Sequence, residues 1–541
     1  MRYFNDPYKE HYESQLLPLQ FSKHYSPHAM VTIPQTAVLD NTGVDLVEID
    51  GEMMAMQADT AAWAFLSQQE AQMYSLLSQL PLLELQQHWP AQAQGSATEF
   101  VSQLYRRGLI TINGHSSIDD TVFRDSSNYD EGHLVELLVT ERCNLGCVYC
   151  LAGTKPDMPV MTPEIAQRTI DLAYQMPTAK KLAFEFSGGE PFLKFPLLQQ
   201  LVTYITNHPQ RNQREVSLVI QTNCTLLDEA RVQWLKDNNI HVGISLDGKP
   251  QSHNISRPQV NGEESFSKLI KGIDLLQRFE VPFGALIVLN RWNIDSVADL
   301  ADFLLDNGIH GFKLNPVAFL GTARESWMSV NVEETEVIAY FKSLVEMVAE
   351  RGYLLLEDNV RTMCEHLTSK QRKTRCLRSH CGAGDTFQAI AASGDIYPCG
   401  RATQTPALKL GNVLDETLAD LAAAGKDHSI LAQIRDRRPD TLSECERCHY
   451  KQLCQAGCSV QALEKYDTVR HRTPECGFYK TLYPFLMRWL SFDRLAFEAL
   501  KSSGYFQPTA LLFDIDYTAE ATLPADYAMP DAIAHQPYAY V

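Results

Sequence analysis

Cysteine spacing constrains this chain more than any other feature of its sequence. The 541 residues include 13 cysteines, which fall into one group near residue 145 and another between residues 376 and 476. The N-terminal MRYFNDPYKE has no apolar signal-peptide core, and the longest apolar runs are too short to span a bilayer. We therefore expect a cytoplasmic protein with no membrane partner, where thiols stay reduced and structural disulfides are rare. In that compartment, spacing decides whether cysteines are core residues or metal ligands.

The first group is a C-x3-C-x2-C sequence formed by Cys143, Cys147 and Cys150. Three thiolates on one tight loop, with Gly146 supplying backbone freedom, can converge on a single metal centre. Three is one fewer than an iron–sulfur cluster normally needs, so one iron could stay open to a small molecule. An open position is typical of a catalytic metal site. Three unrelated thiols are the alternative interpretation.

The second group contains seven or eight thiols without nearby paired histidines. They are Cys376, Cys381, Cys399, Cys445, Cys448, Cys454, Cys458 and Cys476. This number fits two clusters of four thiolates each better than one zinc site. Two structural zinc ions are the alternative.

Residues 1–115 predict a separate winged-helix-like α+β module. Asp50-Gly51 is a hairpin turn, and the capping box Ser67–Glu70 opens a helix. A second helix contains Phe100–Tyr105, and Leu109–Ile112 is a short strand. The polar, aperiodic residues 116–132 then predict a linker.

Strands and helices alternate from residue 133 to 330. Because six strands are each followed by a helix, we expect an α/β fold with parallel strands and right-handed crossovers, hence a partial (β/α)6 barrel. The cysteine loop follows the first strand, at the C-terminal rim where such barrels carry their chemistry. The expected strands are Leu134–Val139, Leu182–Phe186, Val216–Gln221, His241–Leu246, Gly284–Leu289 and Gly311–Asn315.

The rest of the chain divides into three parts. Residues 331–372 are a connecting helical region, with a strongly helical stretch over 333–351. Residues 373–480 show little regular periodicity, which is typical of loops held by metal. Residues 481–541 predict a helix followed by an acidic tail.

Over residues 133–480 the chain resembles the radical S-adenosylmethionine (radical SAM) enzymes with a C-terminal SPASM domain. The first cysteine triple has the family's spacing, with Tyr149 before its third cysteine. Gly188-Gly189-Glu190 follows the second strand as the family's GGE segment does, and Thr222-Asn223 and Ser245 end the third and fourth strands. The resemblance implies a [4Fe–4S] cluster on the triple and an S-adenosylmethionine site formed by Tyr149, Gly188, Gly189, Glu190, Thr222, Asn223, Ser245 and Arg257.

The later cysteines are similar to the SPASM pattern, which implies two auxiliary [4Fe–4S] clusters. One would be held by Cys376, Cys381, Cys399 and Cys458, and the other by Cys445, Cys448, Cys454 and Cys476. Cys376 lies just before the shared pattern, so Cys364 is an alternative ligand. Cys224 and Cys364 are otherwise expected to be bystanders.

The resemblance also implies the chemistry. One electron, from a flavodoxin- or ferredoxin-type reductant, would split S-adenosylmethionine into methionine and a 5′-deoxyadenosyl radical. Enzymes of the SPASM branch act mostly on peptides and proteins. Their sulfatase-maturing members carry an aspartate, acting as a base, directly after the cysteine that is here Cys399, whereas this chain has Gly400-Arg401.

Our first-ranked function is therefore a maturase that installs a C–C, C–O or thioether crosslink, or another modification, in a ribosomally made peptide or protein. Sulfatase maturation, which forms formylglycine, ranks second. Asp385 and Arg401 are candidate catalytic residues near the departure from the sulfatase-type pattern.

The N-terminal module resembles, more weakly, the elements that hold the leader of a precursor peptide as an added strand. A metal-cluster sensor with a DNA-binding winged helix is the non-enzyme alternative. However, 47 Lys and Arg against 66 Asp and Glu give a net charge of −19, which does not favour a nucleic-acid partner.

Overall fold

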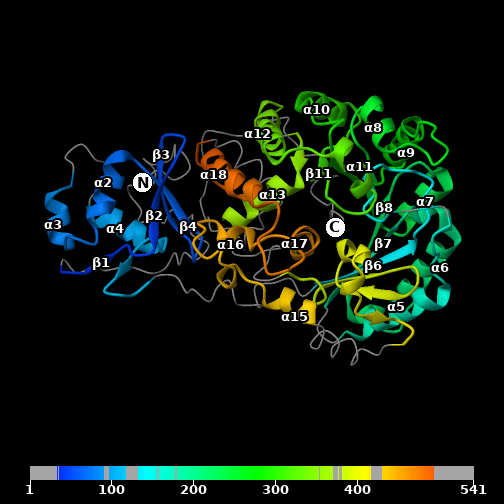
Figure 1. Cartoon of the computed structure of the whole chain (residues 1–541), viewed down its shortest axis with the longest axis horizontal. Helices are drawn as coiled ribbons and strands as arrows, with labels where there is room; N and C mark the ends of the chain where they lie inside the picture. The colour runs from blue at the N-terminus through cyan, green and yellow to red at the C-terminus, as the bar shows by residue number, and fades with distance from the viewer. Residues whose placement is uncertain are drawn as a thin grey trace.

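A ten-stranded sheet forms the centre of the protein in a computed structural model. The described residues are 33, 36–89, 97–116, 132–153, 155, 157–176, 180–351, 354–368, 376, 381–415 and 429–492. Six parallel strands lie side by side in chain order, as expected, and each lies within about two residues of its predicted bounds (Figure 1). They are β6 (Gly132–Thr140), β7 (Lys181–Gly188), β8 (Glu215–Thr222), β9 (Ile240–Ser245), β10 (Phe283–Leu289) and β11 (Gly311–Pro316).

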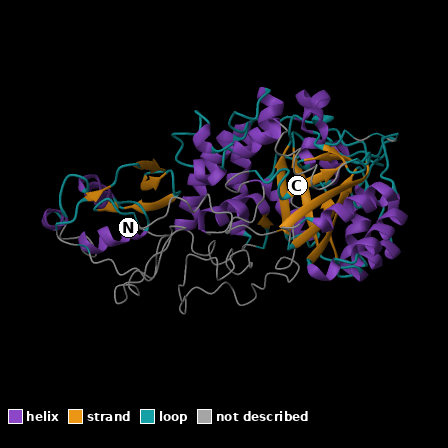
Figure 2. Cartoon of the chain, turned by 90° about the horizontal axis from the view of Figure 1, so that it is seen from below, coloured by secondary structure: helices purple, strands orange, loops and turns teal. Residues whose placement is uncertain are grey.

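Helices cover the outer face of this sheet (Figure 2). They are α5 (Pro163–Gln175), α6 (Phe195–Thr206), α7 (Glu229–Asp237), α8 (Pro250–Ser256), α9 (Phe266–Arg278) and α10 (Val297–Asp306), with α11 (Ala323–Val330) following β11. Val135 and Leu137 of β6 belong to the core beneath these helices. Because side chains alternate along a strand, Glu136 points to the inner face of the barrel.

The cysteine-rich region is more regular than its sequence predicts, because its first hairpin continues the central sheet. β13 (Phe387–Ile390) pairs parallel with β6, and the antiparallel strands β14 (Asp395–Tyr397) and β15 (Gly411–Asn412) follow at that edge. β12 (Leu356–Glu357) extends the opposite edge beside β11. The described part of the region also contains the short helices α15 (Ser429–Asp436), α16 (Lys451–Cys454) and α17 (Ser459–Tyr466).

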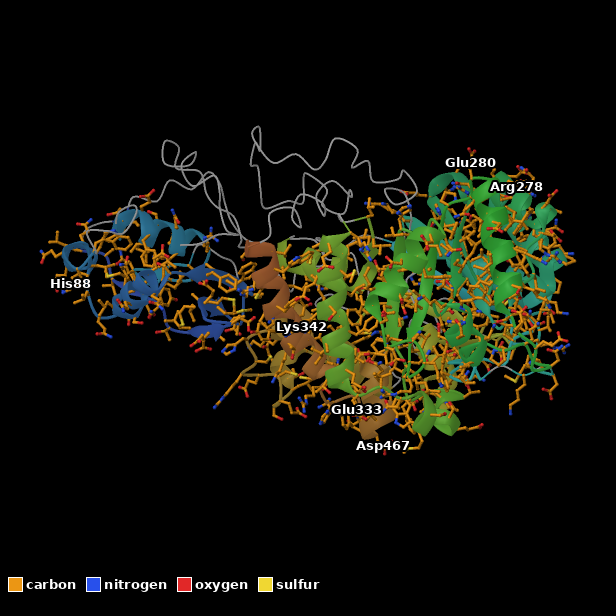
Figure 3. The ribbon with its side chains drawn as sticks, turned by 90° about the horizontal axis from the view of Figure 1, so that it is seen from above. His88, Arg278, Glu280, Glu333, Lys342 and Asp467 are labelled. Atoms are coloured by element: carbon orange, nitrogen blue, oxygen red, sulfur yellow. The ribbon has the colours of Figure 1, made fainter. Side chains whose placement is uncertain are left out.

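Three longer helices lie between the barrel and the N-terminal module (Figure 1). They are α12 (Glu334–Glu350), α13 (Asp358–Thr368) and α18 (Cys476–Phe492). Helices α12 and α18 pack side by side, and Figure 3 shows Lys342 on α12 beside α18. Its Nζ lies 5.3 Å from the centre of the Phe485 ring. The structure confirms the helix predicted over 333–351; the acidic tail lies outside the described residues.

In its described residues, the N-terminal module combines a three-stranded meander with three helices. Its elements are β1 (Leu39–Asp40), β2 (Val44–Ile49), β3 (Glu52–Gln57), β4 (Ala62–Leu66), α2 (Gln68–Leu76), α3 (Leu82–Gln87), α4 (Ala97–Arg106) and β5 (Thr111–Ile112). The turn at Asp50-Gly51 and the capping box at Ser67 are confirmed. Strand β4 was not predicted, because both of its faces are buried and its sequence therefore does not alternate.

The meander is covered on both faces. Ala55, Ala64 and Leu66 pack with the core under α2–α4, whereas Met54 and Trp63 join the large core that includes α18. An ion pair and a hydrogen bond extend this second contact: Asp59 Oδ1 lies 2.5 Å from Lys451 Nζ, and Asp45 Oδ2 lies 2.7 Å from His449 Nε2. The module is therefore docked on the cysteine-rich region.

The predicted linker falls almost wholly on residues 117–131, outside the described residues, so the domain boundaries stay predictions. Within the described part of the chain, none of the helices has the length and apolar character needed to cross a membrane.

Candidate active site

The loop after β6 brings the first three cysteines within electrostatic reach of one another. Burial, with smaller contributions from Glu190 and Cys150, raises the pKa of the Cys143 thiol to about 12. Burial also raises the pKa of Cys147; Arg257 opposes this, and Cys150 and Cys143 add to it. Cys143 and Cys147 are thus kept as neutral thiols in the free protein, and together with Cys150 they are the donors that an iron cluster would convert to thiolates. The residues present therefore fit a cluster.

The cysteine loop is held by backbone contacts from two later segments. Gly146 N donates to the backbone oxygen of Pro258, which follows α8, at 2.7 Å. Gly146 does not have a positive φ, so its backbone conformation does not require glycine. On the other side, before and within α11, Thr322 N donates to Cys150 O at 3.0 Å and Ser326 Oγ donates to Val148 O at 2.5 Å. The loop is thus positioned by two βα units that follow it far along the chain.

The end of β7 packs directly on the stem of the cysteine loop. Gly189 N donates to Thr140 O at 2.7 Å. A Cβ atom on Gly188 would lie 2.3 Å from Thr140 O, and one on Gly189 would lie 2.0 Å from Arg142 O. From the resemblance we expected Gly188 and Gly189 to contribute to the S-adenosylmethionine site. In the structure, their lack of a side chain lets the backbone of the cysteine loop pack closely against them.

Glu190 is a fully buried carboxylate at the centre of the predicted S-adenosylmethionine site. It accepts hydrogen bonds from Thr222 Oγ1 at 2.8 Å, from Asn223 N at 2.8 Å and from Phe192 N at 3.1 Å. Burial raises its pKa to about 7, although these hydrogen bonds oppose the shift. A ligand ammonium would favour the ionised carboxylate, which fits the predicted role.

Asn223 links this carboxylate to the cysteine loop. Its Nδ2 lies 3.7 Å from Cys143 Sγ and 2.9 Å from Asn144 Oδ1. On the neighbouring strand, Ser245 Oγ accepts a hydrogen bond from Gln221 Nε2 at 3.0 Å. The structure thus joins Thr222, Asn223 and Glu190 into one network beside Cys143.

Tyr149 and Arg257 meet at a residue that the sequence reasoning did not select, Asp247. The Tyr149 hydroxyl donates to Asp247 Oδ2, and Arg257 Nε lies 3.1 Å from the same oxygen. Val288 N donates to Asp247 Oδ1 at 3.1 Å, and the Arg257 guanidinium lies 5.4 Å from the Tyr149 ring centre. Burial alone would lower the pKa of Arg257, but Asp247 raises it overall. Asp247 could have been identified from the sequence, because its carboxylate directly follows the predicted barrel strand His241–Leu246.

The later cysteines form two electrostatically coupled groups. Burial raises the pKa of Cys381 to about 12, and the nearby Cys376 and Cys458 thiols add to this shift. Burial also raises the pKa of Cys399, with contributions from Cys381, Cys458 and Cys376. In the second group, burial and then Cys448 raise the pKa of Cys454 to about 12, with Cys445 and Cys476 contributing. These are the two sets of four that the resemblance implies.

Cys364 and Cys224 lie apart from both sets. Burial alone raises the pKa of Cys364, which lies on α13, so the geometry favours Cys376 in the first set. Cys224 packs against Gly272, where an added Cβ would lie 2.5 Å from Cys224 Sγ.

No three His, Cys, Asp or Glu side chains of the described residues are close enough to hold a single metal ion. Cluster ligands bind different irons and so stand farther apart.

The two candidate catalytic residues have different surroundings. Asp385 Oδ1 lies 2.6 Å from Arg435 Nη2, so its carboxylate is engaged in an ion pair. Arg401 lies beside the first auxiliary set: burial opposes its charge, but Cys458 and Glu475 raise its pKa.

Comparison with known proteins gives matches to two family models. A radical SAM superfamily model matches residues 137–304, and an iron–sulfur cluster-binding domain model, SPASM, matches residues 381–449. An uncharacterised protein of Methanocaldococcus jannaschii is 36% identical over 33% of this chain and 59% of its own length. The chain thus spans less than two thirds of that relative.

Two sulfatase-maturating enzymes match over more of the chain. The serine-type anaerobic enzyme of Bacteroides thetaiotaomicron is 25% identical over 58% of this chain and 80% of its own length. The cysteine-type enzyme of Clostridium perfringens is 24% identical over 63% of this chain and 93% of its own length.

Solved structures show the same fold. The structure of anSMEcpe with bound AdoMet aligns with a TM-score of 0.58 at 21% identity, over 68% of this chain and 98% of that one. Streptococcus suis SuiB bound to precursor peptide SuiA aligns with a TM-score of 0.50 at 14% identity, over 83% of this chain and all of that one. The two domain matches and the cysteine geometry agree: the chain carries a radical SAM domain and an SPASM iron–sulfur domain, which use S-adenosylmethionine and [4Fe–4S] clusters as cofactors.

Proposed function

We propose that this enzyme modifies a ribosomally made peptide or protein, installing a crosslink or another side-chain or backbone modification. The observation that carries the proposal is the N-terminal module docked on the cysteine-rich region. The anSMEcpe structure covers 68% of this chain, whereas SuiB with its precursor peptide covers 83%, so the similarity to SuiB extends further along the chain. A fold shared over that extra length supports a peptide substrate.

The module offers an edge for peptide binding. Among the described residues, β2 pairs on one side only, with β3. An extended peptide can add to such an edge through main-chain hydrogen bonds. We infer that the leader of the substrate binds there while its reacting residue enters the barrel.

Three groups of residues at the barrel rim have different roles: one holds the first cluster, one binds S-adenosylmethionine and one excludes water. Cys143, Cys147 and Cys150 would hold the first cluster, and S-adenosylmethionine bound there supplies the 5′-deoxyadenosyl radical when the cluster is reduced. Glu190 and its hydrogen-bond donors would receive the amino group of the ligand. Tyr149, Asp247 and Arg257 close the opposite side and exclude water.

The two later sets of cysteines would each hold an auxiliary cluster. Four thiolates per cluster leave no iron open, which favours electron transfer over substrate coordination. A flavodoxin- or ferredoxin-type protein would supply the electron that starts the reaction.

Sulfatase maturation is the second candidate, because the curated relatives at 24–25% identity carry that name. Gly400, which follows Cys399, separates this chain from the sulfatase-type pattern. The test must therefore distinguish the two substrates.

Coexpression followed by mass spectrometry makes that distinction. We would coexpress the enzyme with each short open reading frame encoded beside its gene and, separately, with a sulfatase-derived peptide. The proposal predicts that a peptide encoded beside the gene loses the mass of two hydrogen atoms, or that its backbone no longer fragments at the modified residues in the mass spectrometer. It also predicts that the sulfatase-derived peptide stays unmodified. Formylglycine in the sulfatase peptide alone would favour the second candidate.

Matched cysteine variants provide the control. Cys143→Ser should abolish the modification and 5′-deoxyadenosine formation, whereas Cys364→Ser, at a buried thiol on α13 apart from the cysteine sets, should retain both. Absence of 5′-deoxyadenosine from the reconstituted wild-type enzyme with S-adenosylmethionine and reductant would contradict the proposal.

A further inference from the structure

Glu136 is a buried residue, and one of its two carboxylate oxygens accepts no hydrogen bond from the described residues. It lies in the middle of β6, points to the inner face of the barrel and is 6% exposed. Ser187 Oγ donates to Glu136 Oε1 at 2.6 Å. Among the described residues, Glu136 Oε2 has no hydrogen-bond partner. A buried acceptor without a protein partner is unfavourable for folding, and a catalytic role is one of the explanations for such a group.

The free oxygen points at the cysteine-rich region. A Cβ atom on Gly400 would lie 2.2 Å from Glu136 Oε2. This approach follows from the sheet: Ala389 of β13 is the register partner of Glu136, and Tyr397 of β14 pairs with Ala389. Glu136 Oε2 therefore occupies the space that a side chain at position 400 would fill.

The same carboxylate is close to both cofactor-binding regions. Gly400 directly follows Cys399 of the first auxiliary set, and Ser187 directly precedes the Gly188-Gly189-Glu190 turn. Glu136 thus lies between the two regions, on the inner wall of the barrel.

Its chemistry suits proton transfer. Burial raises the pKa of Glu136, opposed by the hydrogen bond from Ser187. A carboxylate with a raised pKa is a better base than an exposed one. The other candidates are less suited: Asp385 is engaged by Arg435, and the guanidinium of Arg401 has no acceptor atom.

We propose that Glu136 is the catalytic base that removes a proton from the peptide during its oxidation. This inference rests on the proposed function. Oxidation that removes two electrons and two hydrogens from the peptide releases a hydrogen atom to the 5′-deoxyadenosyl carbon, a proton to Glu136 Oε2 and an electron to an iron–sulfur cluster. The new bond in the peptide forms from the two valences left behind.

The test uses the reconstituted full-length enzyme and the precursor peptide that the wild type modifies in coexpression. With Glu136→Gln, which keeps the side-chain volume and the acceptor for Ser187, we expect 5′-deoxyadenosine to form still. The yield of modified peptide per 5′-deoxyadenosine should fall by about a hundredfold or more, the usual contribution of a general base.

A second variant relocates the carboxylate. Glu136→Ala should lose the modification as Glu136→Gln does, whereas Glu136→Ala combined with Gly400→Asp should recover part of it. The reason is geometric: a side chain at position 400 grows into the space vacated by Glu136. Recovery by a residue of the short 3-10 helix Gly400–Gln404, which lies outside β6, would support the role of the carboxylate itself.

Stability provides a readout independent of activity. Glu357→Gln is the matched control, because Glu357 is also buried with a pKa raised to about 7, but its carboxylate accepts hydrogen bonds from Leu314 N and Val360 N. We expect Glu357→Gln to lower the melting temperature at an unchanged product ratio. Glu136→Gln should not lower it, because one carboxylate oxygen of Glu136 has no partner to lose.

Two results would overturn the inference. One is a wild-type yield of modified peptide from Glu136→Gln; the other is a parallel loss of cluster iron, melting temperature and 5′-deoxyadenosine, which would show a structural role. If the wild type itself modifies no peptide, the proposed function fails instead.

Discussion

Asp247 joins Tyr149 and Arg257 on one side of the predicted S-adenosylmethionine site. It is fully buried, and its carboxylate neutralises Arg257, which is 6% exposed. Asp247→Asn keeps the shape but leaves the guanidinium without a counter-charge. Breaking a buried pair in this way typically costs about 3–5 kcal/mol. We expect a loss of that size in the free energy of unfolding, measured by denaturant titration.

Asp228→Asn is the matched control for that prediction. Asp228 pairs with Arg231 at the surface and caps α7, a role that asparagine also fills. Its change should cost only about 0–1 kcal/mol, the range for exposed pairs. Equal losses from both variants would show that Asp247 does not hold Arg257.

Glu190 makes the affinity for S-adenosylmethionine depend on pH. Its pKa is raised to about 7 in the free protein, whereas the ligand ammonium favours the ionised form. The ligand ammonium therefore favours the deprotonated carboxylate: affinity is highest between the pKa of Glu190 and that of the ligand's own α-amino group, about 8, and falls by up to about tenfold per pH unit below pH 7. Equilibrium dialysis against the reconstituted enzyme would measure this slope. Glu190→Gln should bind weakly with no such slope; an unchanged slope would exclude Glu190 as its source.

At the scale of elements, the packing of the β7 end on the cysteine loop decides whether the first cluster forms. Gly189→Ala would place a Cβ 2.0 Å from Arg142 O and push the two segments apart. We expect the bound iron per chain to fall by about four atoms, the content of one cluster. Iron analysis after reconstitution measures this. Gly146→Ala, whose Cβ would have no neighbour closer than 3.9 Å, should keep its iron; a loss there instead would contradict the packing argument.

The elements that the sequence predicted well are those with a strong local pattern. The six barrel strands and the cap at Ser67 have periodicity or hydrogen-bonding residues that act within a few positions. The β13–β14 hairpin was missed because its strands are only three or four residues long and because β13 is stabilised by pairing with β6, far away in sequence. Glu136 was missed for a similar reason: a single carboxylate in a strand gains its meaning from Gly400, which only the fold brings close.

Across the whole molecule, apolar packing rather than charge fixes the N-terminal module on the rest of the enzyme. Trp63 is 2% exposed and belongs to the core that contains α18, whereas Asp59, the partner of Lys451, is largely exposed. Trp63→Ala should therefore cost about 3–5 kcal/mol and raise hydrogen exchange across β2–β4. Asp59→Ala should cost about 0–1 kcal/mol, because Lys451 keeps Asp440 at 3.1 Å.

The functional consequence follows from the position of the module. If docking places the leader relative to the barrel, Trp63→Ala should reduce peptide modification while S-adenosylmethionine cleavage without peptide stays at the wild-type rate. Asp59→Ala should retain both activities. Because the cleavage site is formed within the barrel, a matching loss of cleavage in Trp63→Ala would show that the module stabilises the barrel itself and does not serve chiefly to position the substrate.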